Sequence, residues 1–222
     1  MLDFIGVLHY EQGDFPLAER FFEEGLALAR QHDQRQIVTN LLQNLGQIAH
    51  EQYKNQGRED GRLSRPLSYY EEVQALARQT GNIDALVGCL AQMSELVSLR
   101  DDFALADALT AEGLDLARQA KANAWIISML DVRAGSFLDR HDLASARQCY
   151  EELLDLASGQ GPDALPRAIA YWGLAHVAEA EKDFQAAHAH AEASLAILKA
   201  RNHFGRKEVS AWIASLPPLP ST

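Results

Sequence analysis

The stretch FFEEGLALAR at residues 21–30 recurs as YYEEVQALAR at residues 69–78. Looser copies of the same pattern follow at residues 109–118, 149–158 and 190–199. The starts of consecutive copies lie 48, 40, 40 and 41 residues apart. Self-similarity at a nearly fixed period of this size is the signature of a repeat protein, in which each unit buries its apolar face only against its neighbours.

A second pattern keeps the same register. An aspartate is followed at once by Phe or Leu, and an alanine comes three residues after that. The four instances are Asp14-Phe15-Ala18, Asp102-Phe103-Ala106, Asp142-Leu143-Ala146 and Asp183-Phe184-Ala187. Aspartate is a favoured N-cap because its side chain accepts a hydrogen bond from the free N–H groups that begin a helix. Each instance therefore predicts a polar turn, a helix start and, at the alanine, a close approach between two helices.

Each copy is accordingly expected to be a helix A, a short turn and a helix B, stacked on its neighbours. In the first copy, helix A covers about residues 2–12 and helix B about 16–31. Helix A of the later copies is expected to begin near Gln36, Ile83, Ala124 and Ala164.

We therefore predict an all-α chain with one repeat domain over residues 1–216. The copies are expected at about 2–33, 36–81, 83–121, 124–160 and 164–201. A last helix at 206–216 has no partner of its own and is expected to cap the final copy. The proline-rich tail at 217–222 cannot continue that helix.

The second copy is longer than the others by about eight residues between Gly46 and Gly61. Two interpretations are open: a longer loop between helices A and B, or a helix A that overshoots before it turns. A tolerated surface insertion is the simpler interpretation, and a loop that contacts a partner is the alternative.

Composition limits the classes of function. Apolar residues make up 47% of the chain and the formal net charge is −11, so we expect no nucleic acid or anionic membrane as partner and a preference for polar or basic ligands. No run reaches the roughly 18 apolar residues that cross a membrane. Two cysteines and an N-terminus without a basic region lead us to expect a cytoplasmic protein.

Motifs for chemistry are missing from the sequence. The eight histidines form no H-E-x-x-H pattern, the cysteines no CxxC pair, and no phosphate-binding or nucleophile-elbow motif occurs. We expect no metal, no cofactor and no enzymatic activity. A catalytic His176 with Glu179 is the remote alternative.

The pattern resembles the tetratricopeptide repeat family. Its small, turn and aromatic positions are matched in the first copy by Gly6, Gly13, Asp14, Phe15, Ala18, Phe22 and Gly25, and in the second by Leu45 and Gly46. The period departs from the usual 34 residues of the family. A period near 40 is similar to the repeats of kinesin light chains and of the sensor arms of large bacterial signalling regulators.

The resemblance implies a right-handed α-solenoid of about five hairpins, in which the A helices line a concave groove that holds a protein or peptide. The implied groove residues are Asn40, Gln43, Asn44, Gln47, His50, Glu95, Asp131, Trp172, His176 and Glu179. The four amides share one helical face, where they could hydrogen-bond an extended peptide backbone. The basic residues of the family's clamp for terminal carboxylates are absent from these positions.

Two roles for such a groove remain open: a protein- or peptide-binding adaptor, and a sensor arm of a bacterial signalling or transcription regulator. A homodimer is a further expectation, because an uncapped first helix A would expose Phe4 and Ile5.

Overall fold

The computed structural model describes residues 2–55 and 60–218, and at residues 60–62 it describes the backbone only. Within these residues the chain folds into eleven helices and no strand, which confirms the predicted all-α class. The helices are α1 (Leu2–Glu11), α2 (Phe15–Gln31), α3 (Arg35–Asn55), α4 (Asp60–Thr80), α5 (Ile83–Ser98), α6 (Phe103–Gln119), α7 (Asn123–Asp139), α8 (Leu143–Ser158), α9 (Leu165–Ala180), α10 (Phe184–Ala200) and α11 (Arg206–Ser215). The four predicted starts of later A helices agree to within one residue.

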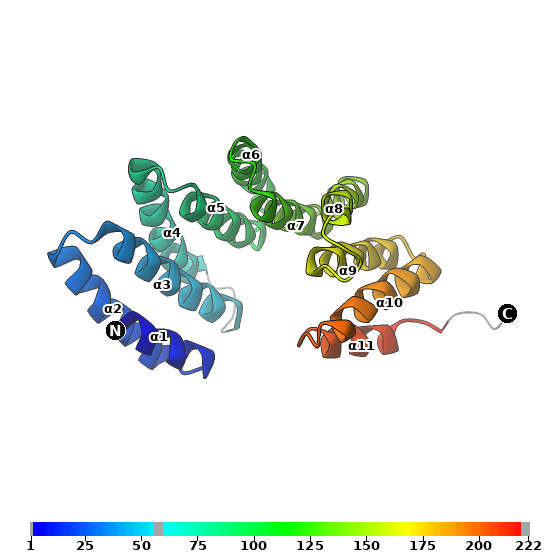
Figure 1. Ribbon diagram of the computed structural model, residues 1–222, viewed down its shortest axis with the longest axis horizontal. Helices are drawn as coiled ribbons and strands as arrows, with labels where there is room; N and C mark the ends of the chain where they lie inside the picture. Colours follow the sequence, from blue (N-terminus) through cyan, green and yellow to red (C-terminus); the bar gives the residue numbers. More distant parts are fainter. Residues whose placement is uncertain (1, 56–59, 219–222) are drawn as a thin grey trace. The chain divides into compact units, whose positions relative to one another are not determined.

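The chain divides into two compact units, Met1–Arg100 and Asp101–Thr222. Unit 1 holds α1 to α5 and unit 2 holds α6 to α11 (Figure 1). The copy predicted at 83–121 is divided by this boundary, since its helix A is α5 and its helix B is α6. A single continuous domain over residues 1–216 stays a prediction.

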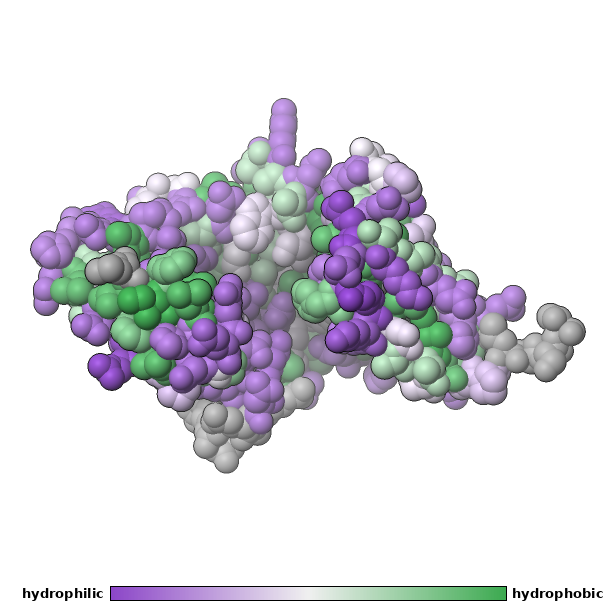
Figure 2. All heavy atoms as spheres, turned by 60° about the horizontal axis from the view of Figure 1, so that its bottom comes forward, coloured by the Kyte–Doolittle hydropathy of each residue, from purple (hydrophilic) through white to green (hydrophobic). Residues whose placement is uncertain are grey.

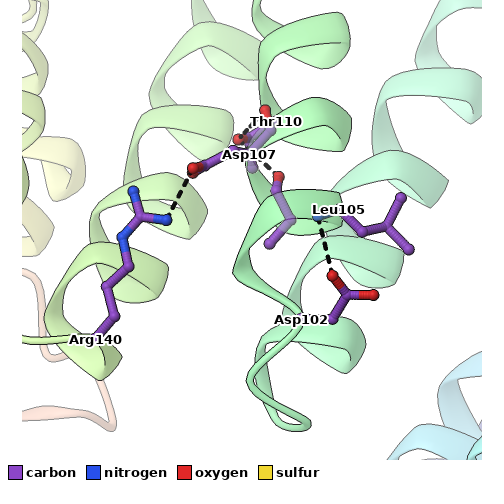
Figure 3. A network of polar contacts seen from close by, with 6 residues as sticks. Asp102, Leu105, Asp107, Thr110 and Arg140 are labelled. Atoms are coloured by element: carbon purple, nitrogen blue, oxygen red, sulfur yellow. Dashed lines mark hydrogen bonds and ion pairs between the residues drawn. The ribbon is translucent and has the colours of Figure 1, made fainter.

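Aspartate caps begin four of the B helices, as the sequence predicts. Asp14, Asp102, Asp142 and Asp183 each accept a hydrogen bond from the backbone N–H three residues further on. Figure 3 shows the bond from the Leu105 N–H to Asp102, with a length of 3.2 Å. Each cap follows a residue with left-handed backbone geometry, which reverses the chain so that helix B can fold back on helix A.

The second copy has longer helices than the others. Helices α3 and α4 have 21 residues each, against 16 or 17 in the helices of the later copies. The extra residues therefore extend the helices, in agreement with the overshooting helix A. Residues 56–59, where a longer loop was the other interpretation, lie outside the described part of the chain.

Glycines on the A helices let aromatic rings of the B helices approach the backbone. A Cβ atom built on Gly46 would lie 2.7 Å from Cε1 of Tyr70, closer than real side chains approach. Phe22 packs on Gly6 in the same way. Both rings are 1% exposed, so neither can move aside without opening the core. This contact sets the distance between helices A and B in both copies.

The two layers of helices are joined differently. Helix α3 contacts α5, and α7 contacts α9, so A helices of successive copies pack on each other within each unit. B helices are linked by long side chains: Arg30 pairs with Glu72 at 2.6 Å, and Arg118 with Glu152 at 2.7 Å. Because the A helices are the more closely spaced, they form the inner layer of each unit.

Arg140 locks α6 to α7 at the start of unit 2. Its Nη1 donates a 2.8 Å hydrogen bond to Oδ2 of Asp107 (Figure 3). Its guanidinium lies 4.4 Å from the ring centre of Phe137. The hydroxyl of Thr110, one turn beyond Asp107, donates to the backbone carbonyl oxygens of Ala106 and Asp107 on its own helix. An arginine held by a carboxylate and an aromatic face has little freedom left.

Helix α11 packs against α10, at the position expected of the capping helix. Val209 is 3% exposed and packs with Ala168 and Leu198. Trp212 meets Trp172 edge-on, with ring centres 4.9 Å apart. The apolar face that α9 and α10 would otherwise leave to solvent is thereby covered.

Removal of one cap tests the predicted turn. We expect Asp102→Ala to lower the free energy of unfolding by about 1 kcal/mol, because the Leu105 N–H loses its acceptor. Asp102→Asn should retain most of the stability, since asparagine caps equally well. Urea unfolding followed by circular dichroism measures both, and an alanine variant as stable as wild type would show that the cap contributes nothing.

Candidate binding face

The four predicted amides lie on one face of α3. Asn40 and Gln47 are exposed, and Gln43 and Asn44 are half-buried. The opposite face supplies the core through side chains that are at most 1% exposed: Leu41, Leu42, Leu45 and Ile48. The expected division of α3 into a polar face and an apolar face is present.

Only part of this amide row is engaged within the protein. Gln36 Nε2 donates to Oδ1 of Asn40 at 3.1 Å, and Asn44 Nδ2 donates to Oδ1 of Asp3 on α1 at 3.0 Å. The side chains of Gln43 and Gln47 make no hydrogen bond to any other residue in the described part of the chain. Their donors and acceptors therefore remain available to a ligand.

His50 corrects one expectation. It was predicted to line the groove, but it is 2% exposed and lies between α3 and α5, with Nδ1 3.2 Å from Oε1 of Gln92. Helical spacing places His50 on the edge of the amide face, and the close approach of α5 covers that edge. Burial, with a smaller effect from Lys54, lowers the pKa of His50 to about 4, so the ring is neutral at pH 7.

Acidic side chains gather toward the ends of α3 and α5. Lys54 Nζ lies 3.9 Å from Oε2 of Glu95. Burial raises the pKa of Glu95, Lys54 opposes this, and the nearby Glu51 carboxylate adds to it. Burial and then Glu51 also raise the pKa of Tyr10 on α1. We call Tyr10, Glu51, Lys54 and Glu95 the acidic corner of unit 1; it has two carboxylates for one lysine.

The predicted residues of unit 2 lie on α7 and α9. Asp131 is half-buried on α7. On α9, Nδ1 of His176 is 3.7 Å from Oε2 of Glu179, and its ring centre is 4.3 Å from that of Trp172. Burial lowers the pKa of His176, and Glu179 opposes this. The contact of this cluster with Trp212 was not predicted, because no local pattern indicates where the capping helix lands.

A cavity of about 220 Å³ lies beside Trp172, between α9, α10 and α11. Its lining is mostly apolar and includes Ile169 and Leu198. Phe204 also lines it and is 82% exposed. The capping helix thus leaves a small apolar opening next to one predicted binding residue.

The described residues hold no group of three or more His, Cys, Asp or Glu side chains that could bind a metal ion. Cys89 and Cys149 are buried free thiols. None of the described helices is long and apolar enough to cross a membrane.

The start of unit 1 exposes apolar side chains. Phe4 is 67% exposed and Leu8 41%, while Ile5 is half-buried. Leu28 and Ile37 are also exposed near this end, and Figure 2 shows hydrophobic surface over the first helices of unit 1. No described residue covers this face, so the predicted homodimer through Phe4 and Ile5 stays a prediction.

The buried histidine predicts how stability depends on pH. The pKa of His50 is about 4 in the folded chain against 6.5 ordinarily, so between these values the unfolded chain binds more protons. Stability should therefore fall as the pH falls from 6.5 towards 4. Between pH 7 and pH 4.5, we expect the free energy of unfolding of His50→Gln to fall by about 2 kcal/mol less than that of wild type. Urea unfolding at the two pH values measures this, and equal losses in both proteins would contradict it.

The exposed N-terminal face gives a second prediction. If two chains meet through it, wild type should be a dimer in light scattering and Phe4→Asp a monomer, because a charge cannot be buried there without a partner. Phe204→Asp, which changes another highly exposed phenylalanine far along the chain, should leave the dimer intact. A monomeric wild type at high concentration would end the dimer hypothesis.

Comparison with known families agrees with the resemblance over part of the chain. A family model described as tetratricopeptide repeat matches residues 125–200. A search of curated proteins finds no match. Repeats of this family generally serve as scaffolds for interactions between proteins, typically without catalysis. Residues 125–200, from the first turn of α7 to the end of α10, are therefore similar to tetratricopeptide repeats.

Proposed function

We propose that the chain is a scaffold that binds a peptide, or an extended segment of a partner protein, on the inner face of its A helices. The observation that carries the proposal is the pair of amides at Gln43 and Gln47, which lie on the polar face of α3 and have no hydrogen-bond partner in the described part of the chain. Gln43 lies between Asn40 and Asn44 along this face, and Gln47 lies one turn beyond Gln43.

The chemistry of amides suits an extended ligand. Each amide has both donors and acceptors, so it can pair with the N–H and C=O groups of a peptide backbone whatever the side chains are. Affinity then comes from the backbone, and preference among ligands comes from charge. The net charge of −11 favours a polar or basic segment.

Unit 2 offers a second set of contacts on its own A helices. Asp131, His176 and Glu179 are polar and half-buried on α7 and α9. Trp172 lies beside them and borders the apolar cavity. Aromatic side chains of this kind are frequent anchors in interfaces. We propose that these residues contact the same class of partner.

Peptide selection tests the proposal. A random peptide library displayed on phage is selected on the immobilised chain, and the affinity of the enriched peptides is measured for wild type and for Gln43→Ala/Gln47→Ala. We expect the double variant to bind about tenfold more weakly, because two ligand groups lose their hydrogen-bond partners.

The matched control removes two amides from the B helices instead. Gln31→Ala/Gln79→Ala changes exposed residues on α2 and α4 and should bind the peptides like wild type. If the inner variant keeps full affinity, or if the outer variant alone loses it, the inner face is not the binding face.

A further inference from the structure

Tyr70 is the least expected polar group in unit 1. The residue is 1% exposed, and its ring packs against Gly46. Its hydroxyl is buried and has no hydrogen-bond partner within the described residues. Buried hydroxyl groups are normally paired, because a group withdrawn from water without a partner costs stability. A phenylalanine would fill the same space without this cost.

The hydroxyl reaches from α4 into the acidic corner. Burial raises the pKa of Tyr70 most, followed by the neighbouring groups Glu95, Tyr10 and Cys89, and last by Glu51. His50, the residue before Glu51 on α3, also has a buried atom, Nε2, without a partner in the described part of the chain. The almost fully buried Tyr70 hydroxyl therefore lies near two carboxylates with its own hydrogen-bonding capacity unused.

The protein's own cation satisfies this corner poorly. Lys54 is 3.9 Å from Glu95, and the two side chains are 42% and 37% exposed. An ion pair this long and this exposed contributes little. The single lysine also faces two carboxylates, and Glu51 raises the pKa of Glu95 through like-charge repulsion. The corner therefore retains a net negative charge that a second cation would neutralise.

We propose that Glu51, Glu95 and the Tyr70 hydroxyl form a binding site for a cationic side chain, arginine above all, carried by a peptide on the inner face. This inference rests on the proposed function and names the ligand chemistry at one point of the groove. A guanidinium has five N–H donors and no acceptor, so it can use two carboxylates and a hydroxyl oxygen together. Lys54 holds the corner when no ligand is present and moves into solvent when one arrives.

An NMR titration of the ¹⁵N-labelled full chain tests the site directly. The probe is the capped peptide Ac-Ser-Gly-Arg-Gly-Ser-NH₂, and its control contains citrulline, which has nearly the shape of arginine but no charge. We expect the arginine peptide to shift amide resonances around Glu51 and Glu95 in a saturable way. The citrulline peptide should bind about tenfold more weakly.

Four variants separate this site from general attraction to an acidic protein. Glu95→Gln should weaken the arginine peptide about tenfold. Glu24→Gln, which removes the same charge from an exposed position on α2, should leave binding unchanged. Lys54→Met should tighten binding, because it removes the competing cation. Tyr70→Phe should weaken binding while leaving the thermal midpoint of the unbound chain unchanged or higher.

The Tyr70→Phe variant also distinguishes a role in binding from a role in stability. If the hydroxyl were needed for folding, its removal would lower the thermal midpoint. Equal losses in Glu95→Gln and Glu24→Gln, or equal binding of arginine and citrulline, would overturn the proposal. If peptides selected on phage bind Gln43→Ala/Gln47→Ala more weakly but bind Glu95→Gln as well as wild type, the groove function is supported and the cation site is contradicted. If the arginine peptide binds the corner but no library peptide depends on the amides, the cation site is supported and the amide groove is not.

Discussion

The contact between the Tyr70 ring and the backbone at Gly46 is the constraint on which unit 1 depends. A side chain at position 46 would occupy the space of the ring, and the ring cannot shift because it is 1% exposed within a packed core. The spacing of α3 and α4 is thereby fixed. Because the ring is fixed, the position of its hydroxyl near the acidic corner is fixed as well. One packing contact therefore supports both the fold and the proposed site.

This constraint is consistent with the proposal that the binding face lies on the A helices. Aromatic side chains of the B helices point inward onto glycines of α1 and α3, so B helices pack with their large residues buried. Successive B helices are then linked by ion pairs between long side chains, such as Arg30 with Glu72. The A helices approach one another directly, through Asn44 with Asp3 and His50 with Gln92. Polar side chains on the inner face of the A helices therefore lie close to one another. A ligand with many hydrogen-bonding groups, such as a peptide backbone, needs several such side chains within reach.

Local chemistry made much of the fold predictable. The aspartate caps need only neighbours in sequence, and all four begin a helix at the expected residue. The cap of α5 was not predicted because the aspartate triplets precede only B helices and α5 is an A helix; Asn82 takes the role and accepts from the Ala85 N–H. The polar face of α3 was also predictable, since helical spacing alone separates Gln43 and Gln47 from Leu41 and Leu45.

The rest depends on contacts between helices, which spacing within one helix does not determine. The burial of His50 follows from how closely α5 approaches α3, and the edge contact of Trp172 with Trp212 follows from where α11 packs. The unsatisfied hydroxyl of Tyr70 was invisible for the same reason: its sequence position predicts a core aromatic residue, and only the packing places its polar end beside Glu95.

Photo-crosslinking of a selected peptide to the chain tests most directly whether the inner layer is the binding face. A peptide enriched by phage display is made with benzoylphenylalanine at successive positions, irradiated on the full chain, and mapped by mass spectrometry. We expect crosslinks to α1, α3 and α5 near the amide row and the acidic corner. Crosslinks confined to α2 and α4 would place the ligand on the outer layer and contradict it.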